Sequence, residues 1–187
     1  MARFHAHTRY KNKDGVLIPG VTTVIGVLNK PYLVTWANKK GLEGIDTTKY
    51  VDEMASVGTC AHHMIECRLK NIEPVLSDFT ANQIDLAEKC AHKFDEWRSR
   101  NDFEIIACEQ ELVSEEFQYG GTVDIIGKLN GEVTLIDIKT SKSIGYEYRV
   151  QVSAYYRVAI ENGISIDKCG ILRVGRKESE GFEYQDV

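Results

Sequence analysis

The stretch 119-YGGTVDIIGKLNGEVTLIDIK-139 decides the fold that we predict for this chain. Residues 133–139 are rich in β-branched side chains and predict a strand, and residues 123–129 predict the strand before it. The dipeptide Asn130-Gly131 between them is the strongest short signal for a hairpin turn. We therefore expect two adjacent strands joined by a tight turn.

Three charged residues lie on this hairpin. Asp137 and Lys139 are two residues apart on one strand, so their side chains project from the same face. The hairpin can bring Asp124 close to Asp137. Two carboxylates held together repel unless a cation shares them, and oxygen ligands on rigid strands suit Mg2+ or Mn2+. A lysine beside such an ion orients or helps to deprotonate an attacking water, or offsets charge on a phosphate oxygen.

This trio predicts metal-dependent cleavage of phosphodiester bonds. The competing interpretation is that an Asp-x-Lys triplet is common and that charges at strand ends are mostly solvated. The residues on either side of the trio favour the first interpretation.

The flanking residues form further motifs. Gly120-Gly121-Thr122-Val123-Asp124 opens the first strand, and Gln151 and Tyr155 share one face of a helix predicted over residues 146–161. A helix predicted over residues 47–70 carries, in this order, Gly58, His62 and Glu66. Taken together, the Gly-Thr-x-Asp, Asp-x-Lys-Thr, Gln-x-x-x-Tyr and Gly-x-x-x-His motifs resemble the PD-(D/E)XK nuclease superfamily, in particular its RecB-like branch.

The resemblance implies a metal site. Its acids are Asp124 and Asp137, and Lys139 is the catalytic lysine. Two further metal ligands that the family implies are His62 and the backbone carbonyl of Ile138.

The family also places an acid on the strand before Gly-Thr-x-Asp. Glu109 and Glu111 could both fill this position, and we favour Glu109 as the metal ligand. The role of Glu66 stays open. His62 and His63 are adjacent on the predicted helix, so at most one of them points inward. We assign His62, because it lies one helical turn from Glu66 on a single face.

The resemblance implies that Gln151 and Tyr155 order the site and touch the DNA backbone. Both could instead form a helix face packed on the sheet, and for Tyr155 the two roles are equally well supported. We also expect substrate contacts from the residues after Lys139, namely Thr140, Ser141, Lys142 and Arg149. Tyrosines that could stack exposed bases are Tyr119, Tyr146, Tyr148 and Tyr155, although most tyrosines in a small domain simply pack.

The predicted elements follow the order of the superfamily's core. Besides the helices and strands above, we predict a helix over residues 80–101 and strands near 105–114, 119–129, 132–139, 169–174 and 182–185. This order implies an α/β fold with a PD-(D/E)XK restriction-endonuclease-like core, αβββαβ, whose mixed central sheet is flanked by helices. We assign residues 47–187 to this core and residues 1–46 to an N-terminal hairpin and helical extension of the same domain.

The N-terminal extension has its own pattern. Residues 3–10 and 16–18 predict a hairpin around Asn12-Lys13-Asp14-Gly15, and helices are expected near 21–28 and 31–41. Residues 19–25 and the helix with Trp36 resemble the N-terminal segment of phage exonucleases and of the mitochondrial genome maintenance exonuclease. In that subgroup the segment helps to enclose a single strand.

Length and composition agree with one nuclease domain. The chain has 187 residues, 43% of them hydrophobic, which suffices for one sizeable core. Its net charge of -5 is unexpected for a DNA-binding protein, because phosphate contacts normally recruit a basic surface. A local basic track could compensate if folding gathers Lys39, Lys40, Lys142, Arg149, Arg157, Arg173, Arg176 and Lys177.

Cysteine usage and the first residues indicate the compartment. The five cysteines form no CxxC pair, which predicts neither disulfides nor a zinc ribbon and favours a reducing cytoplasm. Cys60, His63 and Cys67 could share a helix face and bind zinc, but buried thiols are favoured. Only Cys169 lies late in the chain, so we expect no iron-sulfur cluster. Residues 1–13 predict no export signal, and no apolar stretch is long enough to span a membrane.

We therefore expect a Mg2+- or Mn2+-dependent deoxyribonuclease of a phage or of DNA repair and recombination, and we favour an exonuclease acting on single-stranded DNA ends or flaps. The alternatives are a structure-specific endonuclease with the same site and a non-catalytic nucleic-acid-binding module on the same fold. Cleavage polarity, DNA against RNA preference and oligomeric state stay open.

Overall fold

The computed structural model describes residues 8–28 and 30–187. Its elements follow one another as α1 (Val21–Ile25), α2 (Tyr32–Leu42), α3 (Thr47–Lys70), α4 (Ala81–Ser99), β1 (Phe103–Ser114), β2 (Tyr119–Leu129), β3 (Glu132–Lys139), α5 (Tyr146–Glu161), β4 (Lys168–Val174) and β5 (Phe182–Asp186).

The five strands form one mixed sheet in the order β1-β2-β3-β4-β5. Neighbouring strands are antiparallel except for β3 and β4, which are parallel. Parallel neighbours need a crossover, and α5 supplies it between β3 and β4. The prediction of an α/β fold with a mixed central sheet flanked by helices is confirmed.

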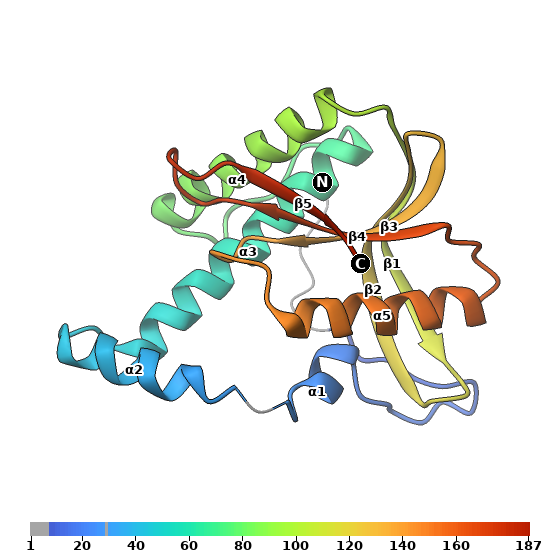
Figure 1. Cartoon of the computed structure of the whole chain (residues 1–187), viewed down its shortest axis with the longest axis horizontal. Coiled ribbons are helices and arrows are strands. Elements are labelled where there is room, and N and C mark those ends of the chain that lie inside the picture. Colours follow the sequence, from blue (N-terminus) through green and yellow to red (C-terminus); the bar gives the residue numbers. More distant parts are fainter. Residues whose placement is uncertain (1–7, 29) are drawn as a thin grey trace.

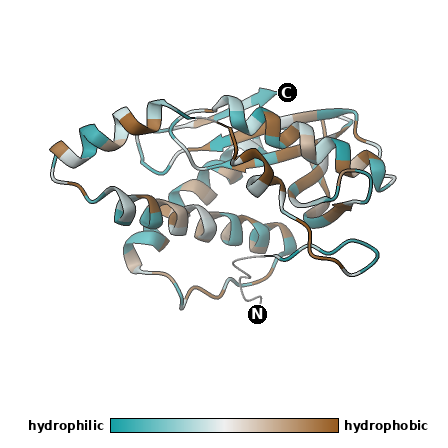
Figure 2. Cartoon of the chain, turned by 90° about the horizontal axis from the view of Figure 1, so that it is seen from below, coloured by the Kyte–Doolittle hydropathy of each residue, from teal (hydrophilic) through white to brown (hydrophobic). Residues whose placement is uncertain are grey.

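Helices cover both faces of this sheet (Figure 1). On one face α3 and α4 pack against the sheet through a cluster that includes Ile65, Phe94 and Trp97. On the other face α5 and α1 contribute to a second cluster that includes Val21 and Val152. The strands between the helices are rich in hydrophobic residues, whereas the helices carry both kinds (Figure 2). The inner strands β2 and β3 therefore face two apolar layers, whereas the edge strand β1 also exposes side chains such as Ile106.

Local signals define the two long helices. The carboxylate of Asp46 caps α3 by accepting hydrogen bonds from the amides of Thr48 and Lys49, at 3.0 and 3.1 Å. Thr80 and Gln83 form a capping box at the start of α4. Among the described residues, no helix is long and apolar enough to cross a bilayer.

Most predicted boundaries agree with the structure. The helices α3 and α5 and the strands β2 and β3 begin and end at the predicted residues. The helix expected over residues 21–28 is wrong in length, because α1 ends at Ile25 and the chain continues with the tighter three-residue bonds from Val27 to Val24 and from Leu28 to Ile25.

Only part of the predicted N-terminal hairpin lies within the described residues, and residues 3–7 fall outside them. Its turn is present: the amide of Asn12 donates to the carbonyl of Val16, and the amide of Ile18 donates to that of Tyr10. Gly15 takes a left-handed conformation with φ 78°, as the turn requires.

Glycines allow this N-terminal segment to lie directly on β2. Gly20 pairs with Gly120 in a parallel bridge, and the ring of Tyr10 lies on Gly120. A Cβ atom on Gly120 would be 2.1 Å from Tyr10 Cγ, and one on Gly121 would be 2.6 Å from Tyr155 Cε1. The Gly-Gly pair therefore serves close packing of two tyrosines on the strand.

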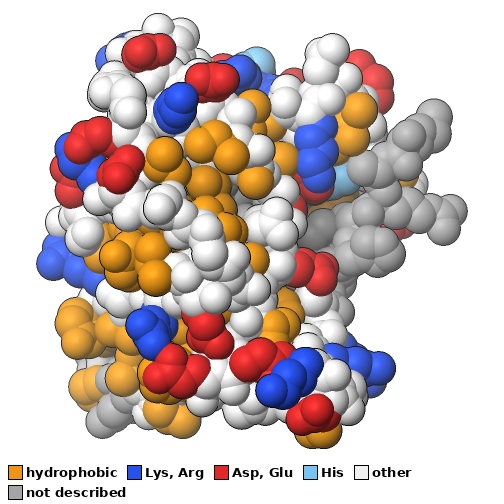
Figure 3. All heavy atoms as spheres, turned by 90° about the vertical axis from the view of Figure 1, so that its right-hand side faces the viewer, with side chains coloured by type: hydrophobic (Ala, Val, Ile, Leu, Met, Phe, Trp, Pro, Cys, Tyr) orange, Lys and Arg blue, Asp and Glu red, His pale blue; other side chains and the backbone are white. Residues whose placement is uncertain are grey.

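Charged side chains of both signs are mixed on the surface. On the face shown in Figure 3, Lys and Arg are interspersed with Asp and Glu around a central group of hydrophobic side chains. Three of the eight basic residues proposed for a track form ion pairs, namely Lys40 with Glu43, Arg157 with Glu116 and Arg173 with Glu183. These pairs reduce the positive charge that is free to meet a phosphate backbone.

Candidate metal centre

The site begins where β2 and β3 part. The two strands pair from Leu129 opposite Glu132 to Ile125 opposite Ile136, and β3 continues beyond this point paired with β4. In the gap, the amide of Ile138 donates a hydrogen bond of 2.7 Å to Asp124 Oδ2. A carboxylate thus takes the place of a strand partner, which fixes its orientation at the end of the hairpin.

Three side chains from different elements converge beside this gap. Ligand atoms of His62 on α3, Glu109 on β1 and Asp124 on β2 all lie within 4.8 Å of one another. His62 Nδ1 is 3.6 Å from Asp124 Oδ1. Two carboxylates and one imidazole therefore form a group that could hold a metal ion.

Backbone geometry directs Glu109 into this cluster. Glu109 has φ 51°, the left-handed region that non-glycine residues rarely adopt. The two strands β1 and β2 pair on either side of it, with Cys108 opposite Ile125 and Gln110 opposite Val123. Such local distortions re-aim side chains and are frequent beside functional sites. Glu111, the other acid considered from the sequence, lies outside the cluster and accepts a hydrogen bond from Thr8.

Asp137 and Lys139 form the second half of the site. They project together as predicted, with Lys139 Nζ 2.6 Å from Asp137 Oδ2. This contact is an ion pair, and neither buried oxygen of Asp137 has a further hydrogen-bond donor among the described residues. Burying a carboxylate with unsatisfied lone pairs is costly, and a cation would satisfy them.

The charges of the cluster shift one another's protonation. Burial lowers the pKa of His62, but the charge of the nearby Asp124 outweighs burial and raises that pKa to about 9. Burial and the charge of Asp124 raise the pKa of Glu109 to about 8. Burial also raises the pKa of Asp137 to about 6, against the opposing effect of Lys139. Because the acidic side chains lie close together, protons stay bound in the cluster at higher pH when no cation is present.

The residues present suit a divalent cation. The cluster offers two carboxylates and one imidazole nitrogen. Asp137 lies outside this group, and its buried Oδ1 has no hydrogen-bond donor among the described residues. Carboxylate oxygens suit Mg2+ and Mn2+, whereas an imidazole ligand suits a transition metal better than Mg2+. The group therefore combines oxygen and nitrogen ligands that could hold a metal ion.

A cavity of about 610 Å3 opens beside His62 and Glu109. Six of its fourteen lining residues carry hydroxyl groups, namely Thr8, Tyr10, Thr22, Thr23, Thr59 and Thr122. The hydroxyl of Tyr10 is 2.8 Å from Thr122 Oγ1, so the N-terminal segment forms one side of this cavity. No local sequence signal singles out Tyr10, because its place depends on the docking of the N-terminal segment on Gly120.

The helix α5 carries Gln151 and Tyr155 to the other side of the site. Both are buried, and Gln151 Nε2 donates a hydrogen bond of 2.7 Å to the hydroxyl of Tyr155. Burial and the charges of Asp124 and Asp137 raise the pKa of Tyr155. Its ring packs on Gly121, so the packing role considered for Tyr155 is present in the fold.

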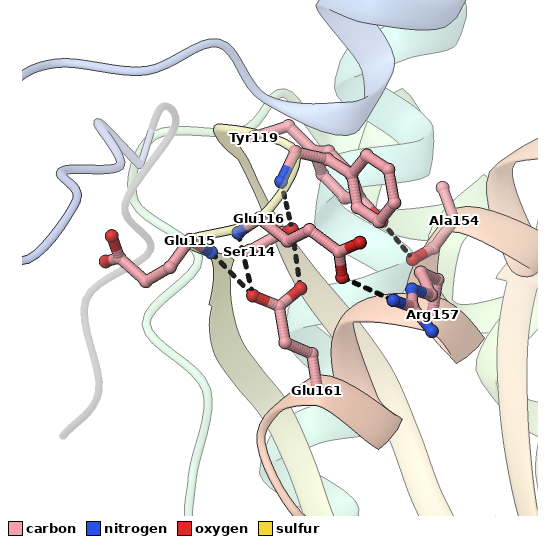
Figure 4. Close-up of polar contacts among 8 residues, drawn as sticks. Ser114, Glu115, Glu116, Tyr119, Ala154, Arg157 and Glu161 are labelled. Atoms are coloured by element: carbon pink, nitrogen blue, oxygen red, sulfur yellow. Dashed lines mark hydrogen bonds and ion pairs between the residues drawn. The ribbon is translucent and has the colours of Figure 1, made fainter.

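The far end of α5 is held by the turn between β1 and β2 (Figure 4). Glu161 accepts hydrogen bonds from the hydroxyl of Ser114 at 2.6 Å and from the amides of Glu115 and Glu116 at 2.8 and 3.0 Å. The hydroxyl of Tyr119 donates to the carbonyl of Ala154 at 2.9 Å. These contacts fix α5 along the sheet and hence the position of its inner face.

The residues that we expected to contact the substrate fall into two groups, those bonded within the protein and those exposed to solvent. Thr140 lies beside Gly58 of α3, and its carbonyl accepts a hydrogen bond of 2.5 Å from Arg176 Nε. The hydroxyl of Ser141 donates to the carbonyl of Ser143. Lys142 and Arg149 are exposed. Thr140 is thus tied to the scaffold, while the two basic side chains are accessible.

The neighbours of His62 on α3 take structural positions. His63 is buried, 3.8 Å from Cys67 Sγ, and Glu66 pairs with Lys70 at 2.5 Å. Cys60 belongs to the apolar cluster between α3, α4 and the sheet. Among the described residues, the group that could hold a metal contains His62 and none of the cysteines. All five thiols are free.

Sequence comparisons with protein families and curated proteins give no match, so the interpretation of the site depends on its geometry. A scan against protein-family models finds no match for the chain, and a search of curated proteins finds no matching sequence.

Proposed function

We propose that the protein is a Mn2+- or Mg2+-dependent deoxyribonuclease, acting as an exonuclease on single-stranded DNA ends or flaps, and that its sheet and helices form a PD-(D/E)XK core. The observation that carries the proposal is the convergence of His62, Glu109 and Asp124 within 4.8 Å. The motif resemblance supports it, because the sequence motifs by themselves select the same residues.

The chemistry follows from the charges of the site. A divalent cation held by His62, Glu109 and Asp124, with Asp137 beside it, would polarise a phosphate and make water a better nucleophile. Water adds across the P–O3′ bond, so one product carries a 5′-phosphate and the other a 3′-hydroxyl. The acids Asp124 and Asp137 keep the site negative, which explains why a phosphodiester needs the cation to approach.

Lys139 acts as a cation in this scheme. Burial lowers its pKa, but the charges of Asp137 and Asp124 outweigh burial and raise it. The side chain therefore stays an ammonium near neutral pH. It can orient the attacking water and support the charge that develops on a phosphate oxygen, rather than take a proton from that water.

The test uses end-labelled linear single-stranded, duplex and covalently closed circular DNA, and a linear RNA, each with Mn2+. Wild type is compared with Lys139→Ala and with Lys128→Ala, which removes the same charge from an exposed position of β2. We expect cleavage of linear single strands by wild type and Lys128→Ala, and a loss of about a hundredfold or more in Lys139→Ala.

Each other outcome favours a different function. Cleavage of closed circles favours the structure-specific endonuclease. Preferential cleavage of RNA removes the assignment to DNA. Binding of DNA without metal-dependent cleavage favours a non-catalytic binding module, and equal cleavage by wild type and Lys139→Ala removes Lys139 from the mechanism.

A further inference from the structure

We propose that Tyr148 is a positioning residue whose aromatic face holds the ammonium group of Lys139 in the site. The proposal rests on the function proposed above for Lys139. Lys139 Nζ lies 5.0 Å from the centroid of the Tyr148 ring, within the range of a cation–π interaction. On its other side the ammonium is 2.6 Å from Asp137 Oδ2.

This arrangement addresses a difficulty of a lysine beside paired acids. A lysine ammonium sits on a flexible stem with several rotatable bonds. The ammonium is in direct contact with Asp137, and further oxygen acceptors around it would occupy its remaining N–H groups. A ring face attracts the cation through its quadrupole without supplying an oxygen acceptor, so N–H groups stay free for water or phosphate.

The fold places the ring for this contact. Tyr148 lies three residues before Gln151 and seven before Tyr155, so the three side chains share the face of α5 that is directed at the site. Tyr148 is partly buried and packs against the apolar cluster under α5. Its ring is therefore supported from behind while its face meets Lys139.

The first turn of α5 is also anchored. The amide of Tyr148 donates a hydrogen bond of 3.2 Å to the carbonyl of Gly145. Glu147 accepts a hydrogen bond of 3.3 Å from the hydroxyl of Tyr32 and lies 3.5 Å from Lys30 Nζ. These contacts restrict the backbone that carries the ring. The neighbouring Tyr146 is 73% exposed, so it offers no comparable support.

Two substitutions separate the aromatic face from the phenol and from packing. Tyr148→Phe keeps the aromatic ring and removes the hydroxyl group. Tyr148→Leu removes the ring and keeps an apolar side chain. Tyr156→Leu, at an exposed position of the same helix, is the matched control. With single-stranded DNA and Mn2+, we expect Tyr148→Phe and Tyr156→Leu to stay within about twofold of wild type. We expect kcat of Tyr148→Leu to fall about tenfold with little change in KM.

A spectroscopic measurement tests the contact without requiring activity. In protein with 13C-labelled lysine, the ring current of Tyr148 should shift the Hε resonances of Lys139 upfield, and Lys139→Arg assigns them by their loss. The shift should persist in Tyr148→Phe and Tyr156→Leu and disappear in Tyr148→Leu. Thermal melts of each variant show whether a change in kcat reflects a smaller folded fraction.

The outcomes decide between the proposals. An unshifted Lys139 resonance in wild type overturns the role of Tyr148, even if Tyr148→Leu does not fold. Equal kcat values for Tyr148→Leu and Tyr148→Phe, with both folded, overturn it as well. If wild type cleaves no substrate but the ring-current shift follows the ring, the contact stands and the nuclease function fails.

Discussion

The amide of Ile138 donates a hydrogen bond of 2.7 Å to the carboxylate of Asp124, across the gap where β2 and β3 separate. Asp124 therefore has two tasks, because the same carboxylate also faces His62 and Glu109. One oxygen satisfies a buried backbone donor, and the other is directed to the candidate metal centre. Substitutions at this position can separate the two tasks.

Asp124→Asn should lose metal binding and keep the fold. An asparagine oxygen can still accept from the amide of Ile138, but it carries no charge for a cation. We expect the affinity for Mn2+ to fall by about a hundredfold, measured by isothermal titration calorimetry. Asp124→Ala should in addition lose about 1–3 kcal/mol in urea unfolding, because it leaves a buried amide without a partner. Equal stability of both variants would contradict this division.

The stability of the metal-free protein should fall as pH rises from about 6.5 to 9. The pKa of His62 is raised from 6.5 to about 9 in the fold, against burial, by the charge of Asp124. Its contribution is complete below 6.5 and is lost as pH passes 9. Burial raises the pKa of Glu109 from 4.5 to about 8. Between these pH values its carboxyl group is ionised in the unfolded chain and protonated in the fold, so the folded state loses stability as pH rises to about 8. Urea melts across this range measure the trend.

Mn2+ should reverse this dependence. Metal ligands must be deprotonated, so the cation competes with the protons on His62 and Glu109. We expect binding to release protons near pH 7 and the affinity to increase up to about pH 9. Calorimetry in buffers of different ionisation enthalpy counts the protons. A binding enthalpy that is independent of the buffer would count against the cluster as the binding site.

Gly121→Ala should destabilise the protein through Tyr155. The new methyl group would lie 2.6 Å from Tyr155 Cε1, and the buried ring cannot move without disturbing its hydrogen bond with Gln151. We expect a loss of about 1–3 kcal/mol in the free energy of unfolding. Gly41→Ala is the control, because a Cβ there meets nothing within 4 Å and alanine favours the helix. It should leave stability unchanged or slightly raised.

Glu161→Gln should weaken the attachment of α5 to the turn between β1 and β2. Glu161 accepts three hydrogen bonds from this turn. The bond from the hydroxyl of Ser114 is the main cause that lowers the pKa of Glu161. Charged acceptors make the stronger bonds, so we expect a loss of about 2 kcal/mol at pH 7. Glu116→Gln removes only the surface ion pair that the same turn forms with Arg157 of α5, and it should change stability by less than about 0.5 kcal/mol. Similar losses in both variants would place the effect in surface charge.

The sequence alone predicts the elements of the fold, because their signals are local. Alternating β-branched residues and the Asn130-Gly131 turn define β2 and β3, and the left-handed φ angles of both turn residues, 52° and 90°, agree with this prediction. Helical periodicity defines α3 and α5 to the residue. The shared face of Asp137 and Lys139 likewise follows from the two-residue period of a strand.

Tertiary structure decides the features that depend on contacts between distant segments. The left-handed Glu109, the parting of β2 from β3 and the unsatisfied oxygens of Asp137 arise from how strands meet, which no local propensity encodes. The ring of Tyr10 on Gly120 and that of Tyr148 beside Lys139 depend on docking of separate elements. Sequence periodicity thus determines which face a side chain takes, whereas packing in three dimensions determines which groups meet it there.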